Sequence, residues 1–170
     1  MQGKEKAIRI TGWIALLVCM LVLTKFILFK NGPHYYKHYF AHEYKNYSVK
    51  QGWQHANLRL FHNILLFTSD KVSAEYSYKN IGGNIIGFIP LGILLPLVFP
   101  FAKNWIRLTC FVFCISLLFE SFQLITGVGI FDVDDLLLNT TGGFIGYILY
   151  AIAKRLMKSP AGLLSVKADI

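Results

Sequence analysis

Residues 81–102 read IGGNIIGFIPLGILLPLVFPFA and contain no charged side chain. A helix crosses the hydrocarbon core of a bilayer with about 20 mostly apolar residues. A helix also satisfies its own backbone hydrogen bonds, which an apolar medium requires. We therefore expect a membrane-spanning helix here, and this excludes an ordinary soluble domain.

Three further segments have a similar length and apolar character, namely residues 10–29, 106–125 and 136–153. The composition agrees, because 55% of the 170 residues are hydrophobic and only 15% are charged. Soluble domains carry about 25% charged residues. The sequence predicts an all-α integral membrane protein with a bundle of about four transmembrane helices. We expect one membrane domain, residues 1–158, followed by a cytoplasmic tail, residues 159–170.

The basic residues predict the orientation of this bundle. They gather before the first span, between the second and third spans, and after the fourth: Lys4, Lys6, Arg9, Lys103, Arg107, Lys154, Arg155 and Lys158. Short loops rich in Lys and Arg stay in the cytoplasm, whereas long loops are largely exempt. We expect a multi-pass protein of the cell membrane with both termini in the cytoplasm. The net charge of +8 then reflects topology, and we expect no nucleic-acid partner.

Residues 30–79 form the long loop that this orientation places outside. The loop combines aromatic and basic side chains, which suit the headgroup layer of a membrane. We expect one or two amphipathic helices lying on the outer leaflet. In the second of them, His55, Arg59 and His62 would share one helical face. Arg59 and His62 are candidates for binding an anionic headgroup.

Polar side chains inside the spans gather towards the same outer side. The candidates are Asn84 in the second span, Glu120 and Gln123 in the third, and Asp132, Asp135 and Asn139 at the start of the fourth. Ionisable groups are costly in a membrane and usually mark function. Two structural explanations stay open: Asp132 and Asp134 can cap the fourth helix, and Glu120 can hold helices together.

Two kinds of chemistry suit these carboxylates and amides. Oxygen ligands bind hard divalent cations such as Mg²⁺ or Ca²⁺, with Asp132 and Asp135 as the candidate ligands. Alternatively, a carboxyl group serves as acid or base beside ionised partners. In that case Glu120, Asp132 and Asp135 are catalytic, and Asn84, Gln123 and Asn139 orient the substrate. The chain has no nucleophile elbow and no phosphate-binding P-loop motif.

Glycine pairs predict where helices pack closely. Gly83 and Gly87 form one small-xxx-small face, and Gly142 and Gly146 form a second. Pro90 follows the first glycine pair in the second span, and because it has no amide hydrogen it frees one backbone carbonyl. We expect both glycine faces to pack against neighbouring helices.

Three stretches carry a resemblance to a known family: NIIGFIPLG at 84–92, FESFQ at 119–123 and FDVDDLLLNTTGGFIG at 131–146. In this order they resemble the VanZ-like family. The resemblance assigns the family's polar motif positions to Asn84, Glu120, Gln123, Asp132, Asp135 and Asn139. Many VanZ-like sequences have an arginine shortly before the aspartates, where this chain has Gly129.

The resemblance implies a multi-pass envelope protein linked to resistance to the glycopeptide teicoplanin. Two functional hypotheses follow. The first is an outer-leaflet enzyme that acts on lipid-linked phosphate or headgroup substrates, such as polyprenyl-phosphate-linked precursors. The second is a non-catalytic protein that binds a membrane lipid or cell-wall precursor and limits glycopeptide access. Transport is a weaker third option, since four spans would need a homodimer to complete a path.

Overall fold

A computed structural model describes residues 2–29, 32–39, 42–67 and 73–158 of the chain. The expected tail, residues 159–170, lies outside these ranges. The four long helices are α1 (Gln2–Leu28), α5 (Ala74–Val98), α6 (Trp105–Thr126) and α7 (Val133–Lys158). Each contains a segment long and apolar enough to cross a membrane. The predicted all-α membrane bundle is therefore confirmed.

The second span ends earlier than its apolar composition predicts. Helix α5 stops at Val98, and a short 3₁₀ helix, η1 (Pro100–Lys103), follows it. Phe99 has an extended backbone, which is the conformation favoured before a proline. Asn104 then caps α6, because its side chain accepts the amides of Ile106 and Arg107 at 3.0 and 3.1 Å. The turn between the two spans is thus short.

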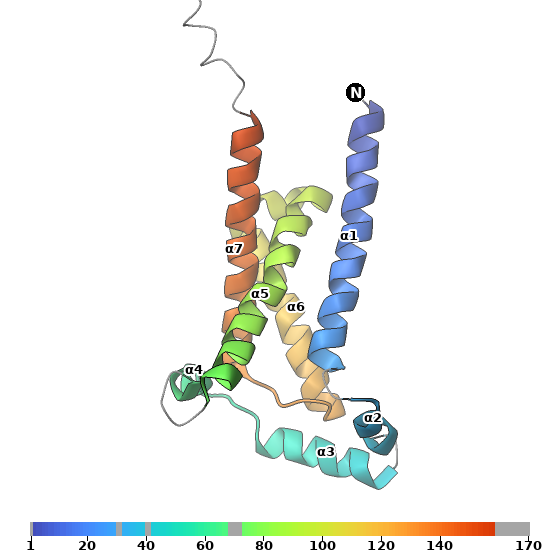
Figure 1. Cartoon of the computed structure of the whole chain (residues 1–170), viewed down its shortest axis with the longest axis vertical. Helices are drawn as coiled ribbons and strands as arrows, with labels where there is room; N and C mark the ends of the chain where they lie inside the picture. Colours follow the sequence, from blue (N-terminus) through green and yellow to red (C-terminus); the bar gives the residue numbers. More distant parts are fainter. Residues whose placement is uncertain (1, 30–31, 40–41, 68–72, 159–170) are drawn as a thin grey trace, which may run out of the picture.

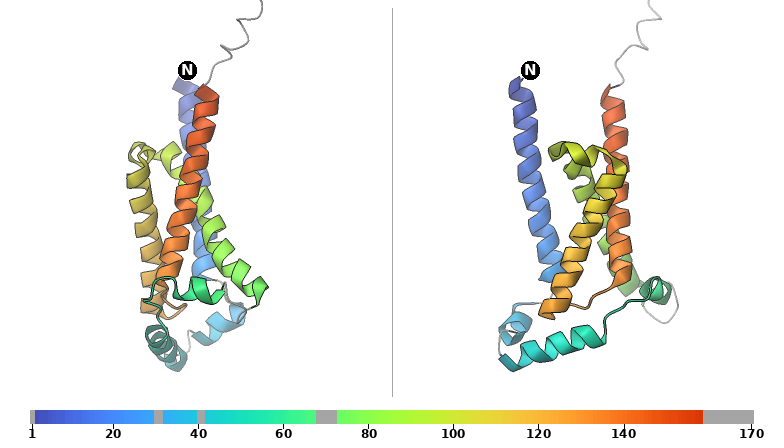
Figure 2. Two further views of the ribbon diagram at one scale, coloured as in Figure 1. Left: turned by 90° about the vertical axis from the view of Figure 1, so that its left-hand side faces the viewer. Right: turned by 180° about the vertical axis from the view of Figure 1, so that it is seen from behind.

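The ends of the long helices fall on two sides of the molecule (Figure 1). The start of α1, the turn between α5 and α6, and the end of α7 lie at one end. The helices that connect α1 to α5 lie at the other end, beside the turn between α6 and α7 (Figure 2). This arrangement groups the basic turn and the basic ends of α1 and α7 together.

The connection from α1 to α5 contains three short helices within the described residues, where one or two were expected. They are α2 (Pro33–Tyr39), α3 (His42–Gln54) and α4 (His62–Phe67). The helical face expected for His55, Arg59 and His62 does not form. Instead, Asn57 pairs its backbone with the start of α7, donating to Phe131 at 2.8 Å and accepting from Val133 at 3.0 Å.

Two tyrosines and one glycine attach α2 and α3 to the bundle. The Tyr36 hydroxyl donates to the carbonyl of Leu28 at the end of α1, and the Tyr39 hydroxyl donates to that of Thr126 at the end of α6. Gly127 ends α6 in a left-handed conformation, with φ of 71°. A Cβ there would lie 2.5 Å from the backbone nitrogen of Val49 in α3. These contacts fix α2 and α3 across one end of the bundle.

Helix α5 packs most extensively against α7, and glycines make this approach close. A Cβ on Gly142 or Gly146 would lie 2.1 Å from the carbonyl oxygen of Ile85 or Ile89. The expected packing face on α7 is therefore confirmed. The prediction of a packing face on α5 is wrong for Gly83, because a Cβ there would meet nothing within 4 Å.

We predict that Gly142→Ala destabilises the bundle, because the added methyl group would collide with the backbone of α5. Overpacking typically costs about 1–3 kcal/mol. Thermal unfolding of the purified protein in detergent should show a clearly lower Tm. The matched control is Gly82→Ala on α5, where a Cβ has no atom within 4 Å. Equal Tm values for the two variants would contradict the close α5–α7 contact.

Candidate functional site

A cavity of about 510 Å³ lies between α1 and α5 and reaches residues of α6 and α7. Its apolar part includes Val22, Leu23, Phe26 and Ile27 of α1 and Ile86, Gly87, Phe88 and Pro90 of α5. Its polar part includes Lys79, Asn80, Asn84, Glu120, Gln123, Asp135 and Asn139. The lining is therefore divided between an apolar region and a polar region.

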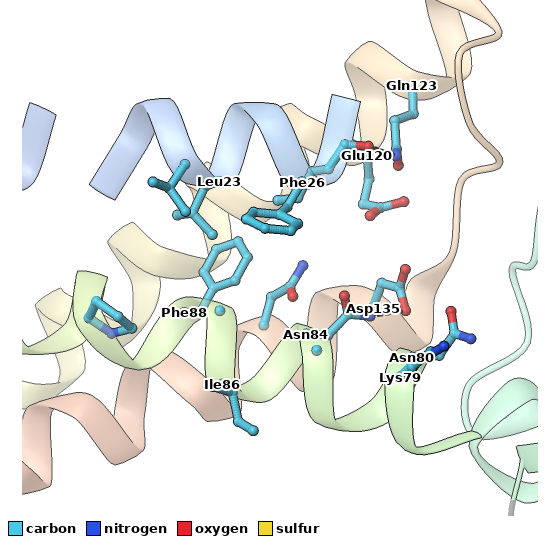
Figure 3. Close-up of a pocket in the computed structure, with 16 residues that line it drawn as sticks. Leu23, Phe26, Lys79, Asn80, Asn84, Ile86, Phe88, Glu120, Gln123 and Asp135 are labelled. Carbon is cyan, nitrogen blue, oxygen red and sulfur yellow. Dashed lines mark hydrogen bonds between the residues drawn. The ribbon is translucent and has the colours of Figure 1, made fainter. Parts of the chain in front are cut away.

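Five of the residues singled out in the sequence meet at this cavity: Asn84, Glu120, Gln123, Asp135 and Asn139. They come from three different helices. Figure 3 shows Leu23, Phe26 and Phe88 gathered in one part of the cavity, with Glu120, Gln123 and Asp135 in another. Residues far apart in the sequence thus share one surface.

Glu120 and Asp135 are the two acidic side chains in the lining. Glu120 on α6 is only 2% exposed, and its Oε2 accepts the backbone amide of Asp132 at 3.0 Å. Asp135 in the first turn of α7 accepts a hydrogen bond from the Asn84 amide at 2.5 Å. Asn84 therefore links α5 to α7 at the polar part of the cavity.

The other two amides also connect helices. Gln123 donates from Nε2 to the carbonyl of Ile27 in α1 at 3.1 Å. Asn139 donates from Nδ2 to the Ser116 hydroxyl in α6 at 2.9 Å. Asn139 is 2% exposed, and its Oδ1 has no hydrogen-bond partner. An unpaired buried acceptor in a cavity lining is a position where a ligand donor would be stabilised.

Asp132 does not line the cavity, although the sequence suggested a catalytic or metal-binding role. It precedes α7 and accepts the amide of Asp134 at 2.8 Å, as an N-cap residue does. Its two oxygens also accept from the side-chain amides of Asn57 and Asn63. Asp132 therefore has the capping role that the sequence left open, and it also joins the connection between α1 and α5 to the start of α7.

The structure gives little support to a divalent-cation site. Among the described residues, no group of three or more His, Cys, Asp and Glu side chains could hold a metal ion. Of the two suggested ligands, Asp135 lines the cavity and Asp132 is occupied by three hydrogen bonds. We therefore assign no chemical step to a metal.

Asp134 has a role that the sequence indicated only as capping of its own helix. It is 1% exposed and accepts the backbone amides of Phe61, Asn63 and Ile64 at 2.5, 2.8 and 3.2 Å. Asp134 thus caps the start of α4, a helix distant in the chain. Phe61 beside it has a φ of 64°, which is uncommon for a residue with a side chain.

Four residues complete the comparison with the sequence. Arg59 and His62 are exposed and do not line the cavity, so their headgroup-binding role stays a prediction. Lys79 and Asn80 also line it, and the sequence placed Asn80 with the other polar side chains but assigned a binding role to neither residue. Asn80 lies one helical turn before Asn84, and this spacing was the available signal. Lys79 forms an exposed ion pair of 2.6 Å with Glu75.

Comparisons with known proteins relate the chain to one family. The family model of VanZ/LLP1 matches residues 13–154 of the chain. Protein VanZ of Enterococcus faecium is 35% identical over 85 residues, which cover 50% of this chain and 52% of that protein. The match therefore spans about half the length of this curated relative. No solved structure matches the chain.

We predict that Asp134→Ala releases the start of α4, because three backbone amides lose their acceptor. Leaving a buried donor unpaired costs about 1–3 kcal/mol. Hydrogen exchange should become at least about tenfold faster at residues 61–64. Asp135→Ala is the control, since the Asp135 carboxylate accepts a hydrogen bond from Asn84 on α5. Unchanged exchange in Asp134→Ala would contradict the capping role.

Proposed function

The chain belongs to the VanZ/LLP1 family, and on this premise we propose that it acts on the headgroup of a lipid in the outer leaflet of the cell membrane. The observation that carries the proposal is the divided lining of the cavity between α1 and α5. A lipid also has an apolar part and a polar part. The cavity offers each of them a matching surface.

Access from the membrane supports this proposal. Three residues that line the apolar part are also exposed on the outside of the long helices: Val22, Phe26 and Ile86. In a membrane these side chains would contact lipid chains. A lipid could therefore enter sideways between α1 and α5, keeping its chains in the apolar part while its headgroup reaches Glu120 and Asp135.

The two carboxyl groups suggest general acid–base chemistry. Glu120 and Asp135 come from α6 and α7 and line the same cavity. In a hydrolytic step, one carboxyl group in its protonated form would donate a proton to the leaving oxygen. The other, ionised, would accept a proton from the attacking water. Asn84, Gln123 and Asn139 hold the surrounding helices and would orient the headgroup.

We propose a link to antibiotic resistance because of the family to which the chain belongs. The VanZ-like resemblance implies an envelope protein connected with teicoplanin resistance, and the matched relative is Protein VanZ. We propose that this chain changes or holds a membrane lipid or a lipid-linked cell-wall precursor and thereby lowers sensitivity to glycopeptides. Polyprenyl-phosphate-linked precursors are one substrate class for the assay below.

A non-catalytic binding protein is the second candidate, and the outer helices favour it. Trp53 is 61% exposed, Leu58 is 75% exposed, and Arg59 beside it is also exposed. Aromatic, apolar and basic side chains together suit the membrane interface. In this alternative the outer surface covers a precursor, and the carboxyl groups only stabilise the bundle.

We predict that Glu120→Gln and Asp135→Asn each lower lipid turnover at least about 100-fold, as loss of general acid–base catalysis does. Purified protein would be incubated with bacterial lipid extract, and mass spectrometry would follow headgroup and polyprenyl-phosphate species. Both substitutions keep the size of the side chain and one acceptor oxygen for the amide of Asp132 or Asn84, so the fold should persist.

The control for this assay is Gly82→Leu, which adds a side chain on α5 outside the cavity lining. It should retain wild-type turnover. Full activity in both carboxamide variants would refute acid–base catalysis by this pair. If those variants also protected cells against teicoplanin, while scrambling residues 34–67 removed protection, the binding alternative would replace the enzyme.

We propose that the end of the bundle carrying α2, α3 and α4 faces outward and both termini face the cytoplasm. The basic residues at the opposite end support this orientation, because such residues are retained inside. Fusions after Lys158 should give fluorescent green fluorescent protein and inactive alkaline phosphatase. Active alkaline phosphatase at this position would reverse the orientation and move the cavity's polar part to the inner leaflet.

A further inference from the structure

The polar part of the cavity is rich in hydrogen-bond acceptors, and this restricts its ligand. Asn84 donates its amide NH₂ to the carboxylate of Asp135, and Gln123 donates its NH₂ to a backbone carbonyl. Neither an ionised carboxylate nor a carbonyl can donate a hydrogen bond. The orientation of both amides is thereby fixed, and their oxygens remain the groups able to accept a donor.

Asn139 provides an independent observation of the same kind. Its NH₂ donates to Ser116, while its Oδ1 has no partner although the residue is 2% exposed. Burying a polar atom without a partner is unfavourable. A ligand donor that reaches this oxygen would remove that cost, whereas a ligand with only acceptors would not.

The charges in the lining also favour a ligand that donates hydrogen bonds. Glu120 and Asp135 contribute two carboxyl groups. Lys79 is the basic residue in the lining, and its Nζ lies 2.6 Å from Glu75 on an exposed surface. A phosphate placed beside the two carboxyl groups would add negative charge and further acceptors. A protonated primary amine brings the opposite charge and three donors.

We infer that the cavity selects a lipid whose headgroup ends in a protonated primary amine. This inference rests on the proposed function, because it names the substrate class of the same cavity. The amine would lie beside the ionised member of the pair Glu120 and Asp135, and the protonated member would face the leaving oxygen of the headgroup. The phosphate of such a lipid would remain nearer to Lys79, whose side chain is 72% exposed. An aminoethyl phospholipid and an amino-sugar lipid share this chemistry.

Binding measurements on the purified full chain in detergent test the inference. Native mass spectrometry would give the Kd for dioleoyl lipids with ethanolamine, choline or glycerol headgroups. Choline keeps the positive charge but has no N–H donor, and phosphatidylglycerol has no cation. We expect the ethanolamine lipid to bind at least about tenfold tighter than either. Glucosaminyl and glucosyl diacylglycerol, compared in the same way, distinguish the amino-sugar source.

Three variants separate the possible results. Asp135→Asn should remove most of the preference for the amine, because one of the two carboxyl groups is lost. Gly83→Leu should weaken binding of every lipid, because Gly83 lines the cavity and a side chain there has free space. Gly82→Leu, outside the lining, should bind as the wild type does.

Three results would overturn the inference. Equal binding of the three phospholipids, with loss in Gly83→Leu, would keep the lipid cavity and reject amine selection. The tightest binding of phosphatidylglycerol would also reject it. Unchanged lipid binding in Gly83→Leu would show that lipids do not use this cavity, and the proposed function would fail together with the inference.

Discussion

The close contact between α5 and α7 is the constraint on which the rest of the structure depends. Gly142 and Gly146 allow α7 to approach the backbone carbonyls of Ile85 and Ile89. Asn84 directly precedes this contact on α5, and there it reaches Asp135. In a membrane, packing between helices cannot rely on the exclusion of water from apolar surfaces. Backbone proximity therefore holds the two helices, and the polar pair beside it lines the cavity.

The cavity itself arises where this contact is absent. Gly83 and Gly87 resemble a packing face in the sequence, but both line the space between α1 and α5. A Cβ on Gly87 would lie 3.7 Å from Leu23, and one on Gly83 would meet no atom. Small residues thus have two uses in this fold. Gly142 and Gly146 bring helices together, and Gly83 and Gly87 leave room between helices.

The sequence predicted the parts of this structure that depend on local pattern. Apolar length identified the four spans, and helical spacing placed Glu120 beside Gln123 on the third span, because both features depend only on neighbours along the chain. The roles of Asp132 and Asp134 depended on partners elsewhere. These partners lie about 70 positions away in the sequence and include Asn57, Asn63 and the backbone amide of Phe61. Helical spacing does not show such pairing. The backbone pairing of Asn57 with Phe131 and Val133 likewise explains why residues 55–61 are not helical.

The cap that Asp134 places on α4 also sets an order of assembly. Translation produces α4 well before α7, so the amides of Phe61, Asn63 and Ile64 are made long before their acceptor. The connection between α1 and α5 therefore cannot complete these hydrogen bonds until α7 has been made. A chain truncated before Asp132 would therefore have its first three spans, while the start of α4 still lacked its cap.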